Sequence, residues 1–136
     1  MNTKVGTQVR VNGEWGTITE VHDGQLTGMI DVRLPGGDVV VPRSEVEERY
    51  SEVHWADGFG VWHCRITDRA EMEPRSSDWA QMIRLARRRI AAELAVRAPR
   101  GTTFDDMFDL VTVARVETDE PHVYEFVEKG AGRNRP

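Results

Sequence analysis

The chain has 136 residues, of which 39% are hydrophobic and 30% charged, and its formal net charge is −5. This length suits one ordinary domain or two very small ones, and no apolar run approaches the roughly 20 residues of a membrane-spanning helix. The acidic balance argues against general nucleic-acid binding. Because the first residues form no apolar signal segment and Cys64 is the single cysteine, we expect a soluble protein of the reducing cytoplasm.

Residues 1–48 are predicted to form a small all-β unit. Runs rich in β-branched residues, such as TQVRV and DVVVP, are separated by glycine-containing turns. Val9 and Val11 alternate with polar neighbours, which indicates a strand with one buried face. Pro42 should end the last strand, because proline cannot donate to a strand ladder. The Ser-Glu-Val that follows predicts a single helical turn placing Val46 over one end of the unit.

The apolar and glycine positions of this unit resemble those of small SH3-like barrels, in particular the KOW and Tudor group. Such barrels bind RNA, ribosomes, methylated side chains or other proteins, so the resemblance implies a fold without a single function. A methyl-lysine cage or a polyproline groove needs several aromatic rings, and Trp15 is the only aromatic residue before Tyr50. We therefore expect a scaffold or a protein-binding surface. The resemblance is carried by the closing VPRSEV and by Gly6, Val9, Val11, Gly13, Gly16, Ile18 and Val21.

Residues 51–130 are predicted to form a ββαββ unit, which makes the whole chain α+β. The stretch HWADGFGVWHC at residues 54–64 opens it, and Asp57-Gly58 predicts a two-residue hairpin turn. In that register both tryptophans and the cysteine face the core, and the histidines face away. The predicted core face holds Val53, Trp55, Gly60, Trp62, Cys64 and Ile66. The opposite face holds Glu52, His54, Phe59, Val61, His63 and Arg65.

A long helix is predicted from about residue 78 to residue 97, after Ser76-Ser77 and before Pro99. Thr103 with Asp106 is expected to cap a brief turn, and MFDLVTVARVE and HVYEFVE should form the last strand pair. Residues 131–136 are expected to be a disordered tail, and the short connection 47–51 predicts that the two units pack together. The helix stripe expected to face the sheet is Trp79, Met82, Ile83, Ala86, Ile90 and Leu94.

The candidate reactive groups do not predict an enzyme. A metal site needs three or four convergent ligands, and the predicted register places Cys64 on the reverse face from His54 and His63. A buried Cys64 would also lack the exposed, activating surroundings of a nucleophilic thiol. The acids Asp105, Asp106 and Asp109 match no known cation-binding motif. We therefore expect no catalytic, cofactor or metal site.

Arginines concentrated on the predicted helix are the strongest electrostatic feature. Residues 78–97 contain five arginines against two acids, and the candidate binding residues are Arg84, Arg87, Arg88 and Arg89. One interpretation is a surface that contacts phosphates or an acidic partner. The other is a solvated face whose arginines pair with acids of neighbouring elements. The second helix that usually accompanies major-groove recognition is not evident in the sequence.

The hairpin and the arginine-rich helix, residues 52–97, also resemble small uncharacterised proteins of actinobacteriophages. Sixteen of the eighteen cationic residues are arginine, which is typical of a high-GC genome. The resemblance implies an accessory or host-modulating protein that binds another component. We therefore predict a non-enzymatic protein–protein interaction module with another protein as its partner. The alternative is a nucleic-acid-binding regulator that uses the helix at residues 78–97.

Overall fold

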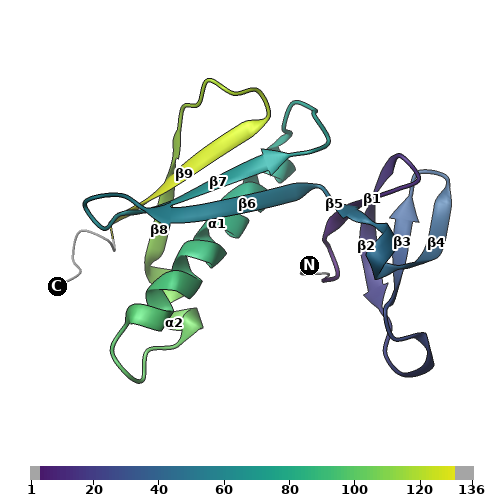
Figure 1. Ribbon diagram of the computed structural model, residues 1–136, viewed down its shortest axis with the longest axis horizontal. Helices are drawn as coiled ribbons and strands as arrows, with labels where there is room; N and C mark the ends of the chain where they lie inside the picture. Colours follow the sequence, from purple (N-terminus) through teal and green to yellow (C-terminus); the bar gives the residue numbers. More distant parts are fainter. Residues whose placement is uncertain (1–3, 131–136) are drawn as a thin grey trace. The chain divides into compact units, whose positions relative to one another are not determined.

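The structure, a computed structural model, describes residues 4–130 and has the predicted α+β fold. The chain divides into two compact units, and the boundary in the sequence lies between Ser51 and Glu52. The first contains a five-stranded sheet, and the second contains a four-stranded sheet with two helices (Figure 1). No helix within residues 4–130 is long and apolar enough to cross a bilayer. The predicted tail, residues 131–136, lies outside the described residues.

In the first unit the antiparallel strands lie in the order β4-β3-β2-β1-β5. Pro42 is the last residue of β4, as predicted. The predicted helical turn is the short 3₁₀ segment η2, after which Val46 joins the core. The elements are β1 Gln8–Val11, β2 Glu14–Val21, η1 Gly24–Leu26, β3 Met29–Leu34, β4 Gly37–Pro42, η2 Arg43–Glu45 and β5 Glu47–Glu48.

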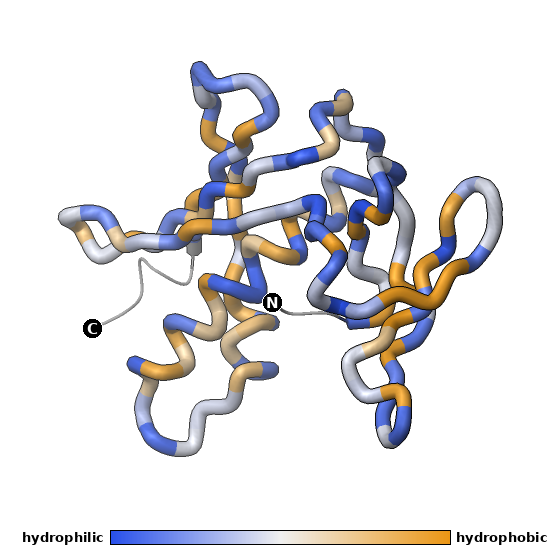
Figure 2. Tube along the Cα trace, turned by 45° about the vertical axis from the view of Figure 1, so that its right-hand side comes forward, coloured by the Kyte–Doolittle hydropathy of each residue, from blue (hydrophilic) through white to orange (hydrophobic). Residues whose placement is uncertain are grey.

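The core of the first unit is built from alternating aliphatic side chains of the strands. Valines alternate with polar residues along β1, whereas β4 contains the continuous run Val39-Val40-Val41; Figure 2 shows the hydropathy of each residue along the chain. Gly16 lets β2 approach β3 closely, because an added Cβ would lie 2.5 Å from the carbonyl oxygen of Arg33 and 2.8 Å from a methyl group of Val32. The buried core residues are Val9, Val11, Ile18, Ile30, Val32 and Val46.

In the second unit the strands lie in the order β6-β7-β9-β8, and α1 covers one face of the sheet by packing on β7, β8 and β9 (Figure 1). Of the predicted helix stripe, Met82, Ala86, Ile90 and Leu94 are buried. Ile83 was placed wrongly, since 40% of its surface is exposed. The elements are β6 Tyr50–Ala56, β7 Trp62–Asp68, α1 Ser76–Arg97, α2 Phe104–Leu110, β8 Val111–Val116 and β9 Val123–Gly130.

A second helix, α2, occupies residues for which the sequence predicted only a turn and the start of a strand. Thr103 accepts a hydrogen bond from the Asp106 N–H at 3.1 Å, and Asp106 accepts one from the Thr103 N–H at 3.3 Å. This capping box satisfies backbone donors that would otherwise lack partners and starts the helix. The Met-Phe-Asp-Leu segment is therefore helical, and β8 begins only at Val111.

The turn between β6 and β7 is one residue longer than predicted. The Asp57 N–H donates to Val61 O at 3.0 Å, the Gly60 N–H donates to Asp57 O at 3.1 Å, and Gly60 adopts a φ of +78°. A β-turn followed by a left-handed glycine makes a three-residue loop closed by Asp57 and Val61. Compared with the predicted register, β6 is shifted by three positions against β7, and this odd number reverses its two faces. The β7 prediction is confirmed, but Trp55 faces away from α1 and His54 faces it.

Candidate interaction site at the β6–β7 hairpin

The Asp57 side chain holds the hairpin turn closed. Its Oδ1 accepts hydrogen bonds from the Phe59 N–H at 2.8 Å and from the Val61 N–H at 3.1 Å. Aspartate is favoured at this place in a turn because its carboxylate reaches backbone donors two residues further on. Together with the two backbone bonds that close the loop, these contacts fix the turn on both sides of Phe59.

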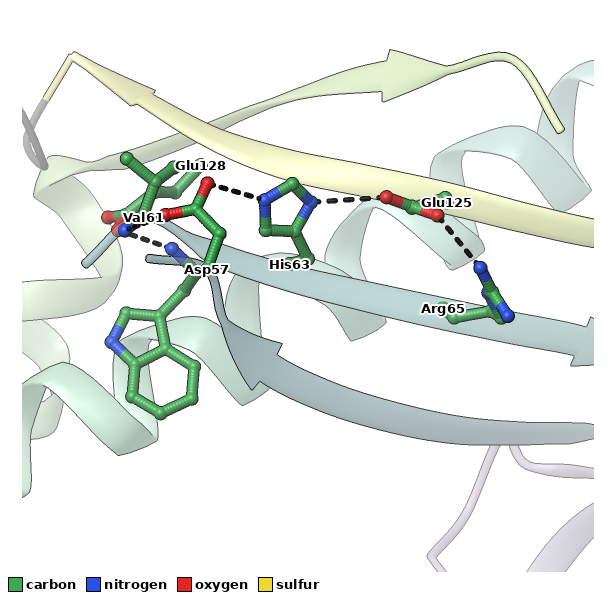
Figure 3. Close-up of polar contacts among 7 residues, drawn as sticks. Asp57, Val61, His63, Arg65, Glu125 and Glu128 are labelled. Carbon is green, nitrogen blue, oxygen red and sulfur yellow. Dashed lines mark hydrogen bonds and ion pairs between the residues drawn. The ribbon is translucent and has the colours of Figure 1, made fainter. Parts of the chain in front are cut away.

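His63 connects this turn to the neighbouring hairpin. Its Nε2 lies 3.1 Å from Asp57 Oδ2, and its Nδ1 lies 3.1 Å from Glu125 Oε1 on β9 (Figure 3). Carboxylates only accept, so both contacts are hydrogen bonds when both ring nitrogens carry a proton. Arg65 donates to the other Glu125 oxygen at 3.3 Å. A chain of polar contacts therefore runs from the turn to β9.

An indole ring lies against this polar chain. The Trp55 and His63 rings are stacked, with centroids 5.2 Å apart and planes 9° apart. The Arg65 guanidinium lies 5.5 Å from the Trp55 ring centroid, within the range of a cation–π interaction. Trp55 therefore restrains the two basic side chains that carry the network.

The network keeps Asp57 ionised. The hydrogen bond with His63, followed by the backbone N–H groups of Val61 and Phe59, lowers the pKa of Asp57 below its ordinary value of 3.8. Hydrogen bonds to the charged form of a carboxyl group favour that form. At neutral pH Asp57 is thus an acceptor for the turn and for His63.

Phe59 stands at the tip of this restrained turn with 94% of its surface exposed. Single exposed apolar residues are common and need no explanation by themselves. Phe59 differs because the backbone around it is held by the Asp57 side chain, and that side chain is held by His63. A restrained, exposed aromatic ring has the properties of an interface anchor, which fills a partner pocket at low entropic cost.

The opposite face of the hairpin is occupied by α1. His54 Nε2 lies 2.9 Å from Glu93 Oε1 of α1, and Cys64 is completely buried. Burial raises the pKa of the Cys64 thiol to about 12, whereas a nucleophilic cysteine needs a lowered pKa. His54 and His63 lie on opposite faces, and His122 precedes β9 with a φ of +61°. The sequence candidates for a metal site therefore do not converge on one point.

The four candidate arginines of α1 divide into two pairs. Arg87 donates to the carbonyl oxygens of Val111 at 2.9 Å and Phe108 at 2.8 Å, which ties α1 to the end of α2.

Arg89 donates to Glu52 Oε1 of β6 at 2.6 Å. Arg84 is exposed and Arg88 is half-buried, and neither makes a hydrogen bond or ion pair within residues 4–130. Arg84 and Arg88 are therefore the two of the four that make no hydrogen bond or ion pair within the described residues.

The hairpin network was missed because its members are far apart in sequence. His63 and Glu125 are 62 positions apart, and only the β7–β9 pairing brings their strands together. The signal available in the sequence was the second glycine, Gly60, two positions after Gly58. It is typical of a longer turn with a left-handed residue.

No protein-family model, curated protein or solved structure matches this chain significantly. The resemblances of residues 1–48 to SH3-like barrels and of residues 52–97 to phage proteins therefore stay predictions.

Proposed function

We propose that the protein is a non-enzymatic protein–protein interaction module that presents Phe59 to a partner protein in the cytoplasm. The observation that carries the proposal is the exposed ring of Phe59 on a turn restrained by Asp57 and His63. An anchor residue of this kind contributes most when it enters an apolar pocket and is fully desolvated there. The deeply buried Cys64 thiol, with its raised pKa, supports a structural role for that residue.

We also propose that the first unit is an SH3-like barrel that serves as a scaffold or a second protein-binding surface. The support is the strand order β4-β3-β2-β1-β5, with a 3₁₀ turn just before β5, around one aliphatic core. Trp15 has the Arg10 guanidinium 5.4 Å from its ring centroid, and Arg10 also pairs with Glu47 at 2.6 Å. These contacts favour a structural role for Trp15.

The test is affinity capture with the full chain, in lysate treated with nuclease, followed by titration of the purified partner. Phe59→Ala should weaken the binding of that partner by about tenfold or more, which is the effect of losing a contact worth roughly 1.4 kcal/mol. The matched control is Val96→Ala, which removes an apolar side chain that is 84% exposed on α1. Equal binding by the Phe59→Ala and Val96→Ala variants would contradict the role of the hairpin.

The second candidate function is nucleic-acid binding through Arg84 and Arg88, which make no hydrogen bond or ion pair within the described residues. A gel mobility shift at several salt concentrations tests it, because each phosphate contact adds about 0.9 to the log–log salt slope on duplex DNA. If this function holds, the log–log salt slope of an Arg84→Ala/Arg88→Ala double variant should be smaller by about 1.8, the value of two phosphate contacts. The control is Arg89→Ala, whose guanidinium is paired with Glu52. Absence of a shift at low salt would remove this candidate.

A further inference from the structure

A β-bulge in the first unit brings two carboxylates together on the outer side of the sheet. The register pairs Ile18 with Val32 and then Glu20 with Asp31, so β2 has one residue more than β3 between these pairs. Without this extra residue, Glu20 would be opposite Ile30, which is completely buried. Bulges commonly redirect a side chain in this way. Here the bulge places Glu20 opposite Asp31.

His22 completes the cluster from the end of β2. It lies two positions after Glu20, and its N–H donates to Met29 O at 3.1 Å, which continues the strand pairing. Its Nε2 is 2.7 Å from Asp31 Oδ1, and its Nδ1 is 4.0 Å from Glu20 Oε1. Residues two apart on a strand share a face, so all three side chains lie on one side of the β2–β3 ribbon.

The cluster carries an excess of negative charge. Like charges directly opposite each other on neighbouring strands destabilise the pairing. No arginine or lysine within residues 4–130 forms an ion pair with Glu20 or Asp31, and His22 is the one basic group that contacts them. The hydrogen bond with Asp31 raises the pKa of His22, so a bound metal ion displaces the imidazole proton. The three side chains then have a charge of −2, which matches a divalent cation.

One ligand atom from each of Glu20, His22 and Asp31 lies within 4.8 Å of the other two. Zinc–ligand bonds of 2.0–2.2 Å place the ligand atoms of a tetrahedral site about 3.4 Å apart. The Glu20 side chain is 62% exposed, while His22 and Asp31 are 19% and 25% exposed. Rotation of the exposed Glu20 side chain brings in the third ligand. His22 Nε2 and Asp31 Oδ1, which are 2.7 Å apart in their hydrogen bond, must separate by about 0.7 Å when an ion takes the place of the shared proton.

We propose that Glu20, His22 and Asp31 bind one divalent transition-metal ion of the Zn²⁺ type, with water completing its coordination. Carboxylate oxygens alone would suit Mg²⁺, Ca²⁺ or Mn²⁺, whereas the imidazole nitrogen favours zinc, copper, iron or nickel. The sequence did not indicate this site, because the metal candidates considered there were His54, His63 and Cys64, and no metal site was expected. The pairing of Glu20 with Asp31 depends on the bulge.

The first experiment is calorimetric titration of the full chain with Zn²⁺ at pH 8, where proton competition for the imidazole is small. The wild-type chain should bind one equivalent. His22→Gln and Asp31→Asn should abolish that step, and Glu20→Gln should weaken it by about tenfold or more. The matched controls, His122→Gln and Glu14→Gln, should bind like the wild type. Saturable binding that survives His22→Gln, or no saturable binding to the wild type, would overturn the proposal.

A second measurement locates the ion. Substoichiometric Mn²⁺ should broaden the backbone amide NMR signals of residues 20–22 and 31 before all others, because paramagnetic relaxation falls steeply with distance. Glu20→Gln changes only an exposed side chain, so its apo spectrum should keep the wild-type pattern and separate lost binding from lost folding. Broadening centred on the β6–β7 hairpin in the wild type would overturn the assignment.

Discussion

The two faces of the β6-β7-β9-β8 sheet use the same residue types for different purposes. On the face covered by α1, Trp62 is only 7% exposed and Cys64 is completely buried. On the other face, Trp55 stacks on His63, which lies between the carboxylates of Asp57 and Glu125. One tryptophan fills a core and the other supports a polar network. Position relative to the turn, rather than residue type, therefore decides the role of each side chain.

The turn itself connects the two faces. Gly60 in the left-handed region adds one residue to the loop, which determines which side of β6 faces α1. The same turn presents Phe59 and holds Asp57 within reach of His63.

The largest effect should come from the covered face. Trp62→Ala should lower the free energy of unfolding by about 3–5 kcal/mol, because it leaves a cavity beside α1. Trp55→Ala should cost less, because it loses about 0.5–1.5 kcal/mol of ring stacking and only the apolar area that this half-buried ring covers. Urea denaturation followed by circular dichroism measures both. Equal losses in the two variants would contradict the distinction between the faces.

A smaller effect should come from the turn. Gly60→Ala should lower stability by about 1–2 kcal/mol, because an L-residue is strained in the left-handed conformation. An added Cβ meets nothing within 4 Å there, so the loss comes from the backbone alone. The matched control, Gly58→Ala, is not at a positive φ and should stay within about 0.5 kcal/mol of the wild type. If Gly60→Ala and Gly58→Ala lower the free energy of unfolding equally, the left-handed conformation of Gly60 does not define the loop.

Local patterns predicted much of the fold. The α+β class, the end of β4 at Pro42, the long helix and the Thr103–Asp106 cap all follow from short-range chemistry. The register failure in the β6–β7 hairpin occurs where the turn is one residue longer than predicted, at Gly60, and the extra residue of the β2 bulge was not predicted at all. Alternation cannot reveal such an insertion, because one residue reverses every later assignment.

The candidate site was harder to predict, because it depends on the register of the turn and also on contacts between segments that are far apart in the chain. Asp57 and Phe59 are adjacent to the turn and were visible in the sequence, but the role of His63 depends on Glu125 from a strand far along the chain. Likewise, Arg87 and Arg89 looked like surface charges. Their contacts with α2, β8 and β6 exist only after the elements have packed.

The smallest effect should be the acid response of the hairpin. Because the folded-state pKa of Asp57 lies below its ordinary value of 3.8, its contribution to stability is fully present above that value. The contribution is lost as the pH falls through the lower folded-state pKa. Asp57→Asn keeps an acceptor oxygen for the turn but removes the charge that faces His63. The difference in unfolding free energy between the wild type and Asp57→Asn should therefore shrink as the pH is lowered from 5 to 2.5.

Denaturation at each pH measures this difference, and Phe59→Ala, which keeps the carboxylate, should follow the wild-type profile. A difference that stayed constant down to pH 2.5 would mean that the Asp57 charge does not stabilise the turn.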